Sequence, residues 1–212
     1  MKVLGIDEAG RGPVIGPLIV AGVIIPEDKN TVLERMGVKD SKRLTATRRK
    51  VLARKLKNMF EHETVEITAE DIDNLRAKNV NLNHIEKIAM IKVAEELLNK
   101  NKYDKIIIDS VDVKPERLEE EVQDIIKDVE VKAEHKADDK YIQVAAASII
   151  AKNERDEIIN KYKKEYRKIG DIGSGYPSDP KTKKFLTKFS YDEMPTIVRK
   201  SWKTVENLKN QE

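Results

Sequence analysis

The segment from Gly5 to Pro13, which reads Gly-Ile-Asp-Glu-Ala-Gly-Arg-Gly-Pro, places two adjacent acids at the end of a short apolar run. The run predicts a strand that stops at Asp7, and a glycine-flanked arginine follows it at once. Side chains alternate across a strand, so Asp7 and Glu8 start toward opposite faces unless the chain turns there. Carboxylates can bind a divalent metal, and an adjacent cation with glycine backbone can bind a phosphate, so the segment suits both ligands together. The alternative, a polar strand end with a solvated turn, is the more frequent meaning of so short a motif on its own.

The composition limits the chemistry that such a segment can serve. The 212 residues favour one domain, and 37% of them are charged. Because the chain has no cysteine, disulfides and thiolate metal sites are excluded. Residues 161–203 hold 12 Lys or Arg against 5 Asp or Glu, a balance of +7, so the rest of this +3 chain carries 3 − 7 = −4. A basic segment beside an acidic site suits a polyanion, although lysine-rich helices facing water would give the same balance.

Hydrophobic periodicity predicts a mixed sheet covered by helices. Strands are expected at residues 2–7, 17–25, 64–68, 105–109 and 129–133. Helices are expected at residues 45–61, 82–99, 116–127 and 139–168, with one or two short basic helices after 170. The second of these helices should present an apolar face made of Ile85, Ile88, Ala89, Val93 and Leu97. A hairpin followed by strand–helix–strand units indicates an α/β fold with a mixed sheet.

A turn-rich stretch at residues 169–175 marks the best candidate boundary in the chain. We therefore expect a catalytic core of residues 1–169. A basic loop and helical region, residues 170–212, would follow it and bind substrate. The same turn residues could equally mark an ordinary loop.

Further acids follow two of the expected strands. The apolar run 106–108 ends in Asp109, and a run this apolar belongs in the middle of a sheet. Asp138 comes just after the fifth strand, where it could also serve as an N-cap or first-turn acid of the long helix. If the 105–109 strand neighbours the first strand in parallel, Asp109 lies beside Asp7. Sites form outside the carboxyl ends of strands in open α/β sheets, so we expect the three aspartates to meet there, with Glu8 adjoining.

A group of four carboxylates repels itself and needs a cationic partner. Two divalent ions would offset four negative charges, and oxygen ligands without a histidine cluster favour Mg²⁺ or Mn²⁺ over Zn²⁺. Two such ions can stabilise both the attacking and the leaving oxygen of a phosphoryl displacement. The pattern therefore points to phosphodiester cleavage or transfer. His135, the histidine nearest the acids, could assist a proton or a phosphate, but a structural role is at least as frequent.

Motifs along nearly the whole chain, from residue 3 to about 203, resemble those of archaeal ribonuclease HII. The matching segments are 5–13, Asp40-Ser41-Lys42, Asp109, His135-Lys136-Ala137-Asp138, 146–152, 173–179 and Arg199-Lys200-Ser201-Trp202. The resemblance implies an RNase H-like fold, with a five-stranded mixed sheet between helices and a helical C-terminal extension. It also implies hydrolysis of the RNA strand in RNA–DNA hybrids and ribonucleotide excision repair. Cleavage would lie 5′ of a ribonucleotide, even one embedded in DNA, and leave 3′-hydroxyl and 5′-phosphate ends.

The resemblance also implies roles for individual residues. The family's catalytic, metal-binding carboxylates match Asp7, Glu8, Asp109 and Asp138. The residues implied to contact nucleic acid are Gly10, Arg11, Gly12, Lys42, Ser148, Lys152 and Tyr176. Tyr176 matches the tyrosine that senses the ribose 2′-hydroxyl, and an aromatic face with a polar tip suits that task. A loop tyrosine that packs on Pro177 is the plainer alternative.

The partners expected are RNA–DNA hybrids and ribonucleotide-containing DNA, with Mg²⁺ or Mn²⁺ as cofactor. No run of 18 apolar residues occurs and the N-terminus enters a strand directly, so we expect neither a membrane span nor a signal peptide. The lack of disulfides fits a reducing compartment, and we further expect a cytoplasmic location and a monomer. Whether the chain contacts a sliding clamp stays open.

The rival interpretations are ribonuclease HIII, another RNase H-like nuclease such as a junction resolvase, and a non-catalytic hybrid-binding module. Arg11 and the short segment before the motif argue against the first, and the Tyr176 loop against the second. The third would not need a carboxylate cluster.

Overall fold

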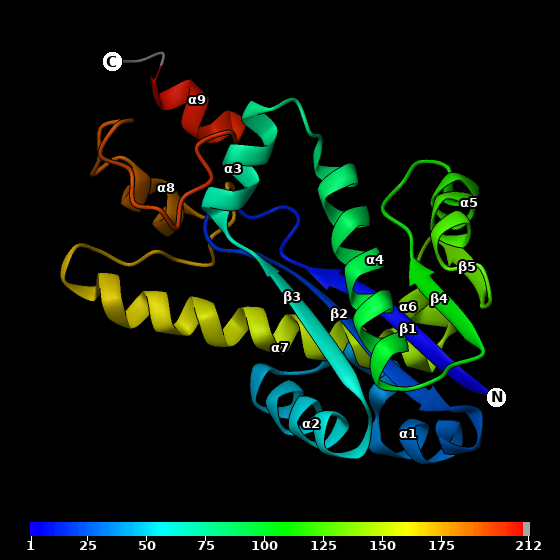
Figure 1. The fold of residues 1–212 in the computed structure, drawn as a ribbon. Coiled ribbons are helices and arrows are strands. Elements are labelled where there is room, and N and C mark those ends of the chain that lie inside the picture. The colour runs from blue at the N-terminus through cyan, green and yellow to red at the C-terminus, as the bar shows by residue number, and fades with distance from the viewer. Residues whose placement is uncertain (210–212) are drawn as a thin grey trace. The chain divides into compact units, whose positions relative to one another are not determined.

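The computed structural model, which describes residues 1–209, contains a five-stranded mixed sheet (Figure 1). The strands run in the order β3-β2-β1-β4-β5. Their bounds are β1 Lys2–Ala9, β2 Leu18–Pro26, β3 His62–Ile67, β4 Lys105–Asp109 and β5 Glu130–Glu134. β1 pairs antiparallel with β2, and it pairs parallel with β4, which in turn is parallel to β5. The predicted fold class is confirmed, and the expected parallel pairing of the first and fourth strands is present.

The helices follow the predicted order with some differences. They are α1 Asn30–Met36, α2 Ala46–Met59, α3 Ala69–Ala77, α4 Leu82–Lys100, α5 Pro115–Ile125, α6 Ala137–Lys140, α7 Ile142–Glu165, α8 Pro180–Leu186 and α9 Lys203–Lys209. Short 3₁₀ turns are η1 Glu27–Lys29, η2 Val38–Arg43 and η3 Tyr166–Lys168. The single helix predicted over residues 139–168 is wrong at its start, because Tyr141 is extended and separates α6 from α7. Among the described residues, no helix combines the length and apolar character that a membrane span requires.

The chain divides into two compact units. The first unit contains Met1–Ala9, Ile19–Val65 and Glu86–Asn153, and the second contains Gly10–Leu18, Glu66–Ile85 and the described residues from Glu154 onward. The functional division predicted between residues 1–169 and 170–212 stays a prediction, because compactness does not show which residues bind substrate.

Two glycines let helices of the first unit pack closely on opposite faces of the sheet. A Cβ on Gly5 would lie 2.2 Å from the backbone carbonyl carbon of Gln143 at the start of α7. A Cβ on Gly22 would lie 2.4 Å from the side chain of Val93 on α4. Gly22 pairs with Ile6, the neighbour of Gly5, so the two glycines face opposite sides of the sheet. The α7 side is therefore also the side toward which Asp7 points.

The second unit has its own apolar core. The buried side chains that build it are Val14, Ile15, Ile159, Ile172, Phe185, Leu186, Met194, Ile197, Val198 and Val205. Phe185 makes edge-to-face ring contacts with Tyr166 and Phe189. An isolated bridge between Ile15 and Val198 ties the loop after β1 to the C-terminal segment. The loop is also held by backbone hydrogen bonds from Val14 to Gly175 and from Gly16 to Ile197.

Candidate active site

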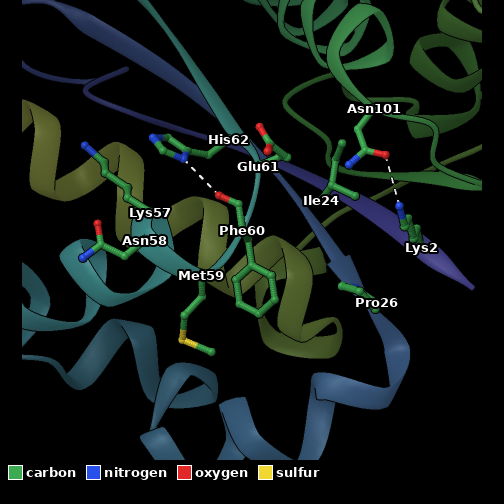
Figure 2. Close-up of a pocket in the computed structure, with 10 residues that line it drawn as sticks. All are labelled: Lys2, Ile24, Pro26, Lys57, Asn58, Met59, Phe60, Glu61, His62 and Asn101. Carbon is green, nitrogen blue, oxygen red and sulfur yellow. Dashed lines mark hydrogen bonds between the residues drawn. The ribbon is translucent and has the colours of Figure 1, made fainter.

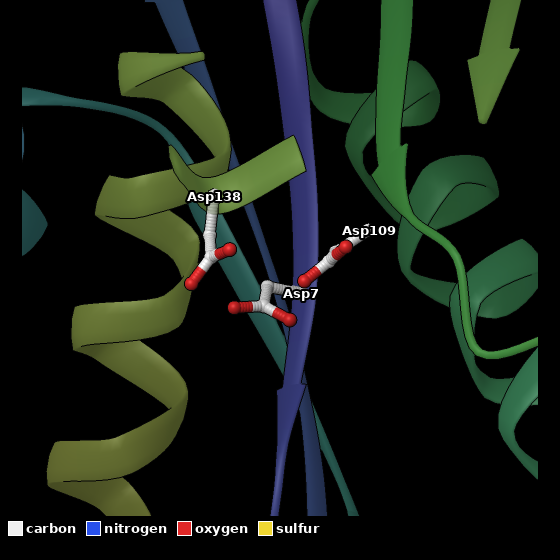
Figure 3. A group of neighbouring side chains, drawn as sticks. All are labelled: Asp7, Asp109 and Asp138. Carbon is white, nitrogen blue, oxygen red and sulfur yellow. The ribbon is translucent and has the colours of Figure 1, made fainter. Parts of the chain in front are cut away.

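Three aspartates from three different elements meet at one edge of the sheet (Figure 3). Asp7, Asp109 and Asp138 each place a carboxylate oxygen within 4.8 Å of those of the other two. Asp7 lies near the end of β1 and Asp109 is the last residue of β4, and the parallel register of these strands puts both on the same face. The convergence expected from the acidic strand ends is therefore present.

The third aspartate is positioned by the turn between β5 and α6. Lys136 adopts the left-handed conformation, with φ 56°, and precedes the first turn of α6. The backbone N–H of Ala137 then donates a 3.0 Å hydrogen bond to Asp109 Oδ1, which fixes the start of α6 against the end of β4. Asp138 is buried in α6, where Lys136 holds the N-cap position, so Asp138 is not the helix cap but a first-turn acid of α6.

His135 in the same turn faces backbone oxygens. Its Nδ1 lies 3.2 Å from the carbonyl oxygen of Ser110, and its Nε2 lies 3.4 Å from that of Val113. Both ring nitrogens thus face carbonyl oxygens of the loop after β4, and the one that carries the proton donates to its oxygen. This arrangement supports the structural alternative for His135.

Glu8 belongs to the other face of the sheet. It continues the alternation of β1, which extends to Ala9, and so points toward α4 rather than α7. Its backbone N–H nevertheless donates a 2.8 Å hydrogen bond to Asp7 Oδ1. Glu8 therefore adjoins the aspartates, as expected, without being one of the three whose oxygens lie within 4.8 Å.

A buried glutamate that the sequence did not single out lies close to Glu8. Glu86 on α4 is fully buried, whereas Ile88, which we expected on the apolar face of that helix, is 50% exposed. Burial, followed by the Glu86 carboxylate, raises the pKa of Glu8 to about 7. Hydrophobic periodicity could not have indicated that Glu86 is buried, because Glu86 interrupts the apolar spacing of the helix and so resembles a solvent-facing residue.

The cluster carries excess negative charge in a buried setting. Burial, then the neighbouring Glu8 and Asp109 carboxylates, raises the pKa of Asp7 well above its ordinary range. Burial also raises the pKa of Asp109. The donors in this cluster are all oxygens, they repel one another, and burial disfavours their ionised form. A divalent cation would offset this repulsion. The residues present therefore fit a hard divalent ion.

Three cluster neighbours come from the predicted nucleic-acid contacts. Lys42 on η2 donates from Nζ to Asp138 Oδ1 at 3.1 Å. Ser148 on α7 is fully buried, hydrogen-bonds to the Asp7 carboxyl group, and accepts a 2.8 Å hydrogen bond from Lys152 Nζ. The contacts of Lys42, Ser148 and Lys152 with nucleic acid stay predictions.

The remaining predicted contact residues lie in the second unit. Gly10 has φ +96°, and a Cβ there would lie 2.4 Å from Arg155 Nε, so only glycine fits without displacement. Arg11 donates from a guanidinium nitrogen to Asn83 Oδ1 at 2.6 Å. The ring of Tyr176 lies 3.4 Å from where a Cβ on Gly12 would stand, and the side chain is 48% exposed. Contact of these four residues with nucleic acid stays a prediction.

The loop that carries Arg11 is held by a residue whose role the sequence did not reveal. Arg199 is fully buried and donates to the carbonyl oxygens of Gly10 at 2.7 Å, Arg11 at 3.1 Å and Gly16 at 2.9 Å. The motif around Arg199 was among the matching segments, but a single sequence does not show that its cation points inward.

A cavity of about 420 Å³ in the first unit lies away from the aspartates (Figure 2). It is lined by Lys2, Ile24, Pro26, Lys57, Asn58, Met59, Phe60, Glu61, His62 and Asn101. Lys2 begins β1, whereas Asp7 lies near the end of that strand. The cavity is thus at the opposite end of the sheet and contains none of the clustered carboxylates.

Comparison with known proteins agrees with this site. A model of the ribonuclease HII family matches residues 4–205. Ribonuclease HII of Methanobrevibacter smithii is 61% identical over 210 residues, covering 99% of both chains, and that of Methanothermobacter thermautotrophicus is 60% identical over 209 residues, covering 99% of this chain and 100% of its own.

Solved structures show the same relationship. The ribonuclease H2 of Pyrococcus horikoshii matches with a TM-score of 0.89 and 41% identity, covering 100% of this chain and 98% of that one. The ribonuclease HII of Archaeoglobus fulgidus, solved as a complex with PCNA, matches with a TM-score of 0.86 and 43% identity over 98% and 96% of the two chains. The chain therefore belongs to the ribonuclease HII family and is a type 2 ribonuclease H, a metal-dependent nuclease that acts on RNA–DNA hybrids.

Proposed function

We propose that this chain cuts on the 5′ side of ribonucleotides, including single ones embedded in duplex DNA, and leaves 3′-hydroxyl and 5′-phosphate ends. The observation that carries the proposal is the convergence of Asp7, Asp109 and Asp138 within 4.8 Å from three separate elements. Their mutual repulsion and burial supply a strong reason for a divalent cation to bind there. Glu8 adjoins the group and serves as the fourth catalytic carboxylate.

Mg²⁺ or Mn²⁺ is the cofactor that fits the donor set. Asp7, Asp109 and Asp138 would hold it through carboxylate oxygens, and Glu8 would complete the site. When bound, a pair of such ions supplies a nucleophilic water and stabilises charge on the attacking and leaving oxygens of the phosphodiester. The protein contributes orientation, because the Asp7 carboxylate accepts hydrogen bonds from its own strand and from Ser148.

Recognition of the ribonucleotide would depend on the second unit. The backbone of Gly10 and Gly12 and the guanidinium of Arg11 suit phosphate contact, since Arg199 holds their loop in place. Tyr176 offers a half-exposed ring and hydroxyl to the ribose 2′-hydroxyl. Lys42 and Lys152 would hold the backbone of the duplex.

Two further expectations belong to this proposal. The Archaeoglobus fulgidus relative was solved with PCNA, which supports a sliding-clamp contact for this chain as well. The monomeric state and the cytoplasmic location remain predictions.

One assay tests the reaction directly. A labelled DNA duplex with a single ribonucleotide is incubated with Mg²⁺, Mn²⁺ or EDTA, and the product ends are mapped. We expect cleavage with either metal, none with EDTA, and 3′-hydroxyl and 5′-phosphate ends. A 2′,3′-cyclic phosphate product, or activity in EDTA, would contradict the metal-dependent hydrolysis.

The site is tested by removing single charges. Asp7→Asn and Asp109→Asn should each reduce cleavage by a factor of about 10³ or more while hybrid binding in EDTA stays within about threefold. Asp128→Asn, the same chemical change at an exposed position of the first unit, is the matched control and should cleave normally. Full activity in either site variant would remove these carboxylates from the mechanism.

A further inference from the structure

The segment 38–59 of the first unit is strongly basic. Its cationic residues are Lys39, Lys42, Arg43, Arg48, Arg49, Lys50, Arg54, Lys55 and Lys57. Its only acid is Asp40, so the segment carries 9 − 1 = +8, against +3 for the whole chain. Six of these cations and no acid fall within α2. This concentration lies outside residues 161–203, where the overall charge asymmetry first pointed to substrate binding.

The cations occupy the solvent side of α2. The helix buries Leu52, Ala53 and Leu56. Its exposed positions carry Arg48, Lys50, Arg54 and Lys55, which we call the α2 basic face.

This charge pattern works against the helix that carries it. Lys50 and Arg54 are four residues apart, and like charges at that spacing destabilise an isolated helix. Within residues 1–209, Arg54 and Lys55 have no carboxylate at ion-pair distance. By contrast, Lys105 of the same unit is paired with Glu130 at 2.6 Å. Arg48 donates to the carbonyl oxygen of Met36, so Arg54 and Lys55 are the cations of this face whose charge is most available to an anion outside the protein.

The basic segment begins at the carboxylate cluster. Lys42 on η2 contacts Asp138, and α2 starts three residues after η2 ends. The connection is ordered: the side chain of Thr45 caps α2 by accepting from the N–H of Arg48, and Arg49 donates to the carbonyl oxygen of Leu44. A polyanion that reaches the cluster therefore meets Lys42 at the start of a strongly basic segment that continues into α2.

We propose that the α2 basic face is a second duplex-binding surface, which holds the phosphate backbone of the nucleic acid beyond the scissile site. The contact is electrostatic, independent of sequence and sensitive to salt. The proposal rests on the proposed function only in that it takes a nucleic-acid duplex as the ligand. Binding is measured without cleavage, so failure of this surface and failure of the catalytic mechanism give different results.

The test uses the full chain in EDTA and measures anisotropy of labelled RNA–DNA hybrids over a salt series. The double variant Arg54→Gln/Lys55→Gln should weaken binding of a hybrid of roughly 24 base pairs by about tenfold at low salt. The slope of log K against log salt should fall by about 2, since about 0.9 counterion is released per neutralised phosphate. A hybrid of roughly 8 base pairs, centred on the cleavage site, should bind as tightly as it does to the wild type.

The matched control removes the same charge elsewhere in this unit. Lys92→Gln/Lys127→Gln changes two exposed lysines on α4 and after α5 and should leave the slope unchanged. A second variant, Arg48→Gln/Lys50→Gln, tests the other half of the α2 basic face and should lower the slope likewise. An unchanged slope in both α2 variants, or an equal fall in the control, would overturn the proposal. If the α2 variants still produce 3′-hydroxyl and 5′-phosphate ends but show a reduced slope of log K against log salt, the result supports the proposal independently of the catalytic mechanism.

Discussion

The ammonium nitrogen of Lys42 lies 3.1 Å from a carboxylate oxygen of Asp138 and 2.7 Å from one of Asp139. The first of these carboxylates belongs to the buried cluster and the second is exposed. Lys42 therefore supplies a positive charge to the cluster from a residue that is itself half exposed. A divalent cation at the same aspartates would compete with it for Asp138.

Removing Lys42 should make the carboxylates more available to metal. We expect Lys42→Ala to bind Mn²⁺ a few-fold more tightly by isothermal titration calorimetry, because the cation no longer shares Asp138 with an ammonium group. The free energy of unfolding should change by less than about 1 kcal/mol, since the pair is exposed on the lysine side. Lys39→Ala, an exposed lysine of the same 3₁₀ turn, is the control. Equal Mn²⁺ affinity in wild type and Lys42→Ala would show that the contact does not compete.

The stability of the metal-free protein should fall as pH rises through neutrality. Burial raises the pKa of Glu8 to about 7, so the folded state binds a proton that the unfolded state has already released near pH 4.5. The stabilising contribution is complete below the unfolded-state pKa and is lost as pH increases through about 7. Asp7 adds to the effect in the same direction. Urea unfolding in EDTA at several values between pH 5 and pH 8 measures it.

The same titration has a built-in comparison. Glu8→Gln should flatten the decline between pH 5 and pH 8, because glutamine keeps the shape of the side chain and has no proton to lose. Glu120→Gln, at an exposed position of α5, should leave the decline as it is. Stability that is constant or rises with pH in the wild type would contradict the assignment.

Gly5 should tolerate no side chain. A Cβ there would lie 2.4 Å from the carbonyl oxygen of Gln143 and 2.6 Å from the backbone nitrogen of Val144, so α7 would have to move. We expect Gly5→Ala to lower the free energy of unfolding by about 3 kcal/mol. Activity should fall further, since Ser148 on α7 hydrogen-bonds to Asp7.

A second glycine separates this clash from a backbone effect. A Cβ on Gly37 would meet nothing within 4 Å, but its φ of +85° disfavours alanine. Gly37→Ala should therefore lower stability by about 1 kcal/mol in chemical denaturation. Equal losses in the two variants would mean that α7 adjusts to Gly5→Ala without strain.

Arg199 should be essential to the loop that carries Arg11. Arg199→Met keeps the apolar stem but leaves the carbonyl oxygens of Gly10, Arg11 and Gly16 without the donors that serve them. We expect a loss of about 3 kcal/mol in the free energy of unfolding, together with faster hydrogen exchange in residues 10–16. Arg167→Met, at an exposed position, should change neither measurement. Unchanged exchange in the loop would show that other contacts hold it.

Local patterns predicted the elements of this fold well. The five strands appear within about two residues of their expected ends, since apolar runs bounded by glycine, proline or acids are strong strand signals. Thr45 caps α2 and Pro115 begins α5, and both residue types are typical of helix starts. α1 and α3 were missed, because both are short and carry little periodic apolar spacing. The break at Tyr141 was missed because nothing in the residues around it forbids a continuous helix.

The sequence by itself determined that acids would stand at the ends of apolar strands, because hydrophobic periodicity and strand ends are properties of neighbouring residues. Only the tertiary structure decided which faces they share. The register of β1 against β4 sends Asp7 and Asp109 to the α7 side, while Glu8 meets the buried Glu86 of α4. Lys42 reaches Asp138 across 96 positions of the chain, and Arg199 reaches Gly10 across 189. Such contacts depend on burial and pairing between distant segments, and no local pattern records them.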